Sequence, residues 1–145
     1  MHDILLFLHV AGAIFWMGGM AFMVLALRPA LAMVEPPLRV KLVEAILRRF
    51  FVVVAASIAM LALTGAALFA DMQPRPAGVH VMAGLGLLMM LVFGHIYFVP
   101  WRRLRAASSR EDWPVAGAAT GQIALLAKVN LGLGWVAIAA VILWH

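Results

Sequence analysis

The sequence has 145 residues, of which 66% are hydrophobic and 12% are charged, and its formal net charge is +5. A soluble globular domain has about 25% charged residues, so this composition excludes an ordinary water-soluble fold. The length fits a single membrane domain over residues 1–145. The absence of cysteine excludes disulfides, thiolate metal sites and iron–sulfur clusters.

Four apolar segments follow one another along the chain, at residues 4–27, 51–70, 79–99 and 123–144. Each has about the 20 residues that a helix needs to cross the hydrocarbon core of a bilayer. The first segment lacks the basic leader and the cleavage site of a secretory signal peptide, so we expect it to remain in the mature protein. The pattern predicts an all-α fold, an integral membrane bundle of four transmembrane helices.

Basic residues are concentrated in two of the three connections and predict the orientation. The second connection, residues 71–78, has only Arg75, and the other ten basic residues are Arg28, Arg39, Lys41, Arg48, Arg49, Arg102, Arg103, Arg105, Arg110 and Lys128. Because basic residues are retained on the cytoplasmic side, the first and third connections are expected inside and both termini outside, in the periplasm of a bacterial inner membrane. Topology and attraction to lipid headgroups explain the positive charge, so no nucleic-acid partner is expected.

Histidines are the candidate functional groups inside these segments, because an ionisable side chain in hydrocarbon is costly to keep there. At about 1.5 Å per residue, His9 lies about 9 Å below the outer end of its helix, and His80 lies near the outer end of the third. His95 lies about 22 Å below His80, too far for both to bind one metal ion. Four-helix membrane bundles hold b-type haem between two imidazoles, so His9 and His80 form the candidate pair. The candidate cofactor-binding residues are His9, His80, His95 and Trp16.

Methionine is the second kind of ligand that the sequence offers, with ten residues in the chain. Met20 shares a stripe of the first helix with His9, Ala13, Trp16 and Met23, at heptad-like spacing, and we expect this stripe to face the other helices of the bundle. Thioether and imidazole together suit Cu(I), which predicts a copper site as the alternative to haem. The candidate metal ligands are His9, His80, Met20 and Met82, with His2 or His145 as additional external ligands.

Simpler explanations exist for the same residues. Methionine is an ordinary apolar filler of membrane helices, and an interfacial histidine such as His80 can bond to lipid or to a loop carbonyl. Lys128 and Asn130 lie near the height of His95, so a polar cluster near the cytoplasmic side is a further option. Lys128 can equally extend to the inner headgroups.

Three runs of the sequence resemble a known family. They are LHVAGAIFWMGGMAFMVLALRPAL, RRFFVVVAASIAMLALTGAAL and LLAKVNLGLGWVAIAAVIL, and together they resemble the membrane domain of the CopD family of copper-resistance proteins over nearly the whole chain. The pattern of His9, Trp16 and Gly18, with Lys128 and Asn130 in the last segment, also resembles HemJ. HemJ is a four-helix membrane protein associated with haem and protoporphyrinogen oxidation, and this resemblance implies that His9 is a haem ligand.

Three functions are compatible with the sequence. The first is a haem b redox protein, acting in electron transfer or as a small oxidoreductase between the quinone pool and a periplasmic acceptor. The second is copper binding or transport across the inner membrane through His and Met ligands, with a periplasmic copper protein as partner. The third is a structural subunit without a cofactor. The haem function is preferred, because a four-helix chain is small for a transporter unless it forms a homo-oligomer. No catalytic group is identified.

Overall fold

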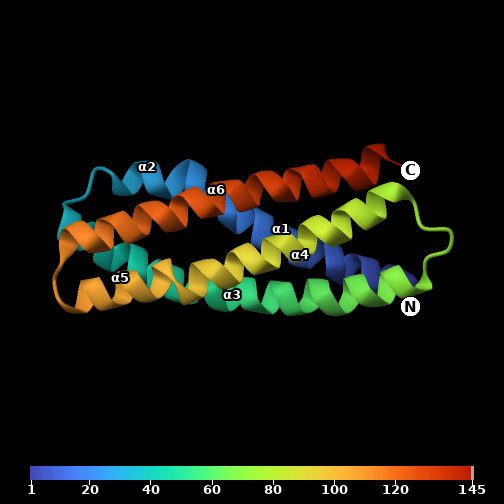
Figure 1. Cartoon of the computed structure of the whole chain (residues 1–145), viewed down its shortest axis with the longest axis horizontal. Helices are drawn as coiled ribbons and strands as arrows, with labels where there is room; N and C mark the ends of the chain where they lie inside the picture. Colours follow the sequence, from blue (N-terminus) through green and yellow to red (C-terminus); the bar gives the residue numbers. More distant parts are fainter. Residues whose placement is uncertain (145) are drawn as a thin grey trace.

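The computed structural model describes residues 1–144 and consists of long helices that run side by side along one axis (Figure 1). Within these residues, four helical rods are long and apolar enough to cross a membrane, at His2–Leu31, Pro36–Asp71, Ala77–Ser109 and Trp113–Leu143. The prediction of an all-α, multi-pass membrane protein with four spans is therefore confirmed.

The first rod combines α1 (His2–Phe22), the π-helical turn η1 (Met23–Leu27) and the short helix α2 (Arg28–Leu31). Pro29 explains the π-helical turn. A proline inside a helix removes one backbone donor, and its ring clashes with the carbonyl four residues earlier. Here that carbonyl belongs to Leu25, inside η1, where the wider turn relieves the clash.

The remaining helices are α3 (Pro36–Asp71), α4 (Ala77–Phe98), α5 (Pro100–Ser109) and α6 (Trp113–Leu143). Three of them, α3, α5 and α6, have a proline in their first turn. Proline suits this place, because the first backbone N–H groups of a helix have no partner inside it. The carboxylate of Asp112 caps α6 by accepting a hydrogen bond of 3.3 Å from the backbone N–H of Val115.

Helices extend beyond the predicted spans at the end with most basic residues. Instead of beginning near residues 51 and 123, α3 begins at Pro36 and α6 at Trp113, and part of the third connection forms α5. The 36 residues of α3 reach about 54 Å, more than the roughly 30 Å of hydrocarbon. Apolar length indicates where lipid surrounds a helix, whereas the helix itself ends at its caps.

An aromatic contact between α3 and the third rod forms part of the core. The ring centroid of Phe51 lies 5.6 Å from that of Phe93, 5.9 Å from Tyr97 and 5.1 Å from Trp101, in edge-to-face or steeply inclined arrangements. Such pairs stabilise a core beyond the area that they bury. They fix α3 against both α4 and α5 in the half of the molecule that carries most of the basic residues.

Both ends of the described chain lie at the same end of the bundle, beside the connection between α3 and α4 (Figure 1). There Gly78 brings α4 against α6: its backbone N–H donates to the carbonyl oxygen of Trp144 at 3.0 Å, and a Cβ atom would overlap the carbonyl of Ala140. This arrangement agrees with an even number of spans. The side of the membrane on which the termini lie stays a prediction.

Candidate metal centre

His9 is half-buried between α1 and α3, where it contacts Thr64. The imidazole Nδ1 lies 3.0 Å from the hydroxyl oxygen of Thr64, and that hydroxyl donates to the carbonyl oxygen of Met60 at 2.6 Å. Because the only hydroxyl proton of Thr64 is used in this way, its oxygen accepts the hydrogen bond from His9. The His9 proton is therefore on Nδ1, and Nε2 keeps a lone pair that can bind a metal ion.

Two glycines allow a close approach of the helices around His9. A Cβ atom on Gly65 would lie 2.9 Å from Cε1 of His9, and a Cβ atom on Gly12 would lie 3.1 Å from the methyl carbon of Met60. Gly12 is one turn from His9 on α1, and Met60 is one turn from Thr64 on α3. The imidazole of His9 and the thioether of Met60 thus occupy neighbouring turns of the same interface.

More methionines follow along the interior of the bundle. The sulfur of Met17 packs against Gly134 of α6, where a Cβ atom would overlap it, and the methyl carbon of Met89 would lie 3.2 Å from the same Cβ. Met20 and Met89 are 3% and 5% exposed, in one cluster with Trp16. From His9 to Met20 the distance along α1 is about 16 Å. We call Met60, Met17, Met89 and Met20 the methionine column.

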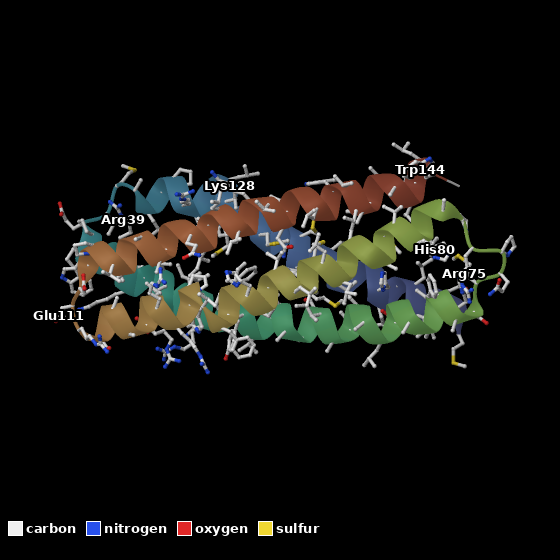
Figure 2. All side chains as sticks on the ribbon, viewed as in Figure 1. Arg39, Arg75, His80, Glu111, Lys128 and Trp144 are labelled. Carbon is white, nitrogen blue, oxygen red and sulfur yellow. The ribbon has the colours of Figure 1, made fainter. Side chains whose placement is uncertain are left out.

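His80 lies on α4 at the end of the bundle near Arg75, as Figure 2 shows. Its side chain is exposed, and its ring packs edge-on against Phe69, with 5.3 Å between ring centroids. His9 and His80 therefore contact the same helix, at Thr64 and Phe69, which are about 7.5 Å apart along its axis. Binding of one cofactor by both imidazoles stays a prediction.

The other predicted site residues are spread over the bundle. Trp16 is buried beside Met20, in agreement with its place on the predicted stripe, whereas Met82 is half-buried and His95 is exposed on α4. Residues 1–144 contain no group of three or more His, Cys, Asp or Glu side chains that could hold a metal ion. Thioethers are the soft donors that this part of the chain offers beside its histidines. His145 lies outside the described residues.

Lys128 and Asn130 have different surroundings. Lys128 is exposed on α6 (Figure 2), while Asn130 is 1% exposed and its Nδ2 donates to the backbone carbonyl of Met89 at 3.3 Å. Asn130 is thus part of the bundle interior, and its side-chain amide bonds to the backbone of α4 rather than to His95 or Lys128.

Thr64 and Met60 were not recognised as candidate residues from the sequence. A signal was present for one of them, since Ser57 and Thr64 are the most polar residues in the apolar segment 51–70. For Met60 no such signal exists, because methionine in a membrane helix is most simply explained by packing.

These features define a multi-pass integral membrane protein with a four-helix bundle and a small, half-buried polar site between α1 and α3. The model of the copper resistance protein D family, CopD, matches residues 44–144, and the chain belongs to this family. The matched part includes Met60, Thr64 and Asn130, whereas His9 and the rest of α1 precede it. No curated protein and no solved structure matches the chain. The resemblance to CopD is thereby confirmed, and the resemblance to HemJ stays a prediction.

Proposed function

We propose that this protein binds Cu(I) inside its helix bundle and passes the ion across the membrane. Membership of the copper resistance protein D family supports copper as the cargo. The ligands available in the interior, one imidazole and several thioethers, are soft donors of the kind that Cu(I) prefers. The observation that carries the proposal is the hydrogen bond between His9 and Thr64, because it leaves Nε2 of His9 unprotonated.

The methionine column supports a route for the ion. Cu(I) would bind first at Nε2 of His9 with the sulfur of Met60, and then exchange these ligands for Met17, Met89 and Met20 deeper in the bundle. Each exchange replaces one soft ligand by another, so the ion keeps protein ligands in a medium that solvates charge poorly. Thioethers are uncharged, so the empty column adds no fixed charge to the interior.

The haem b function has less support from the described side chains. His9 has Thr64 as its partner, and His80 packs on Phe69. Close packing at Gly12 and Gly65 means that a porphyrin beside His9 would have to separate α1 from α3. The donor set around His9 therefore fits a single soft ion better than a planar macrocycle.

An anaerobic titration of the purified protein tests the proposal. Cu(I) is added in competition with a chromophoric chelator, to wild type and to the variants His9→Ala, Met60→Leu and Met33→Leu. We expect wild type to take Cu(I) from the chelator. His9→Ala and Met60→Leu each remove a ligand, so their affinity for Cu(I) should be at least about ten-fold lower. Met33 is 91% exposed, so its replacement should change nothing.

Two results of this titration would overturn the proposal. One is a wild-type protein that cannot compete for Cu(I) at any chelator ratio. The other is a red preparation with a Soret band that shifts on reduction and disappears in His9→Ala, because this would assign His9 to haem.

A further inference from the structure

A second site lies deeper in the bundle, apart from His9. It is a cavity of about 330 Å³ lined by residues of α1, η1, α2, α3, α4 and α6. Its wall is mostly apolar, and it includes the exposed residues Arg28, Ala32 and Gly117, so the cavity reaches the surface of the bundle. The π-helical turn Met23–Leu27 contributes to this wall, and π-helical turns occur frequently at functional sites. An apolar cavity of this size, entered from the surface of a membrane protein, suits a small lipid-soluble molecule.

One buried hydrogen-bond acceptor in the wall has no partner. Asn130 uses its Nδ2 to bond the carbonyl oxygen of Met89, but its Oδ1 accepts no hydrogen bond from any residue of the described chain, 1–144. A buried carbonyl oxygen without a donor is costly, and each such group needs an explanation. A ligand that carries an O–H or N–H group would supply the missing donor.

Aromatic side chains restrict the class of ligand further. Trp16, Phe50, Phe51 and Phe93 all line the cavity. Among them Phe93 meets Trp16 and Phe51 edge-to-face, with ring centroids 6.5 Å and 5.6 Å apart, so their orientations are set before a ligand enters. A ligand with an aromatic ring would be stabilised in this cavity, because pairs of aromatic rings gain energy from inclined or offset contacts. The ligand should therefore combine an aromatic ring with a donor group.

We propose that this cavity binds a membrane-soluble hydroquinone, with its ring among the four aromatic side chains and one hydroxyl group donating to Oδ1 of Asn130. Hydroquinones dissolve in the bilayer and can enter where the cavity reaches the surface. The proposal concerns binding alone and does not require copper binding at His9, and the two sites meet at Met20, which belongs to the methionine column and lines the cavity.

The test compares two probes of nearly equal shape. A decyl-substituted benzohydroquinone and its di-O-methyl ether, which lacks O–H donors, are titrated into the detergent-purified protein under anaerobic conditions. Quenching of tryptophan fluorescence reports binding, because Trp16 lines the cavity, and a Trp16→Phe variant identifies its share of the signal. We expect wild type to bind the hydroquinone about ten-fold more tightly than the ether. Only the hydroquinone can donate a hydrogen bond to the buried Oδ1 of Asn130, and one such bond has about this effect on affinity.

Variants locate the effect at Asn130. Asn130→Leu should bind both probes with equal affinity, and Asn130→Ser, which keeps a shorter acceptor, should recover part of the preference. Thr120→Val is the matched control. Thr120 also lines the cavity, but its hydroxyl already donates to the carbonyl of Ala116 at 3.0 Å, so the preference should remain.

Two results would overturn the inference. Equal affinity of wild type for the hydroquinone and its ether would show an unselective apolar cavity, such as one filled by a lipid chain. Quenching that does not saturate would show that neither probe has a site. If Asn130→Leu does not fold, the wild-type ratio and the Asn130→Ser variant still decide the question.

Discussion

The imidazole of His9 and the hydroxyl of Thr64 join α1 to α3 through a hydrogen bond of 3.0 Å between Nδ1 and Oγ1. Because Thr64 donates its own proton to the carbonyl of Met60, one tautomer of His9 is selected and its ring is oriented. A side chain that orients a ligand in this way usually affects metal affinity even though it never touches the metal.

Replacing Thr64 by valine should therefore weaken Cu(I) binding without removing any ligand. We expect an affinity about ten-fold lower in the chelator competition, as is typical when the partner of a ligating histidine is lost. Thr120→Val is the control, because Thr120 makes the same kind of bond to its own helix without a histidine partner. An unchanged affinity in Thr64→Val would show that the tautomer of His9 is irrelevant.

The contact of Gly78 with α6 should make this glycine necessary for stability. Gly78→Ala places a methyl group against the carbonyl of Ala140, so we expect the thermal unfolding midpoint in detergent to fall by at least about 3 °C. Gly84 lies on the same helix, and a Cβ atom there would have no neighbour within 4 Å, so Gly84→Ala should leave the midpoint unchanged or raise it. Equal effects of the two substitutions would contradict the close approach of α4 and α6.

Gly134 and Met17 should be energetically coupled. In Gly134→Ala the new methyl group displaces the end of the Met17 side chain from its packing, which should destabilise the protein modestly, whereas adding Met17→Ala makes room for that methyl. In a double-mutant cycle of unfolding free energies we expect a coupling of about 0.5–3 kcal/mol, with the double variant more stable than the sum of the singles predicts. Simple additivity would show that the two residues do not touch.

The orientation in the membrane can be tested with single cysteines, because the chain has none of its own. Gln73→Cys lies in the connection between α3 and α4, and Ser109→Cys lies at the end of α5, and both positions are exposed. In intact cells, a membrane-impermeant maleimide should label position 73, and it should label position 109 only after permeabilisation. The opposite pattern would place the termini in the cytoplasm.

The fold could be predicted from the sequence because lipid imposes a simple requirement. Four apolar runs of sufficient length imply four helices, and basic residues between them imply an orientation. The helix ends were less predictable. Prolines start α3 at Pro36 and, with the Asp112 cap, α6 at Trp113. Both starts lie in polar stretches, which a search for apolar segments does not include. The stripe that carries His9, Trp16 and Met20 was predicted to face the bundle. Trp16 and Met20 are buried, as this prediction requires, and His9 is half-buried.

The partners of His9 could not be predicted for a physical reason. Finding Thr64 and Met60 requires the rotation of α3 about its axis, and a helix that is apolar on every side carries little information about that rotation. The same limit applies to Asn130, whose contact with the backbone of Met89 depends on how α6 packs against α4.

The most direct test of copper binding by the interior of the bundle is X-ray absorption spectroscopy of the purified protein loaded with one equivalent of Cu(I). We expect the copper spectrum of wild type to show both sulfur and imidazole nitrogen neighbours, and the nitrogen shell to be lost in His9→Ala while sulfur remains. A wild-type spectrum with oxygen neighbours alone, or one that His9→Ala and Met60→Leu leave unchanged, would contradict a copper site formed by His9 and the methionine column.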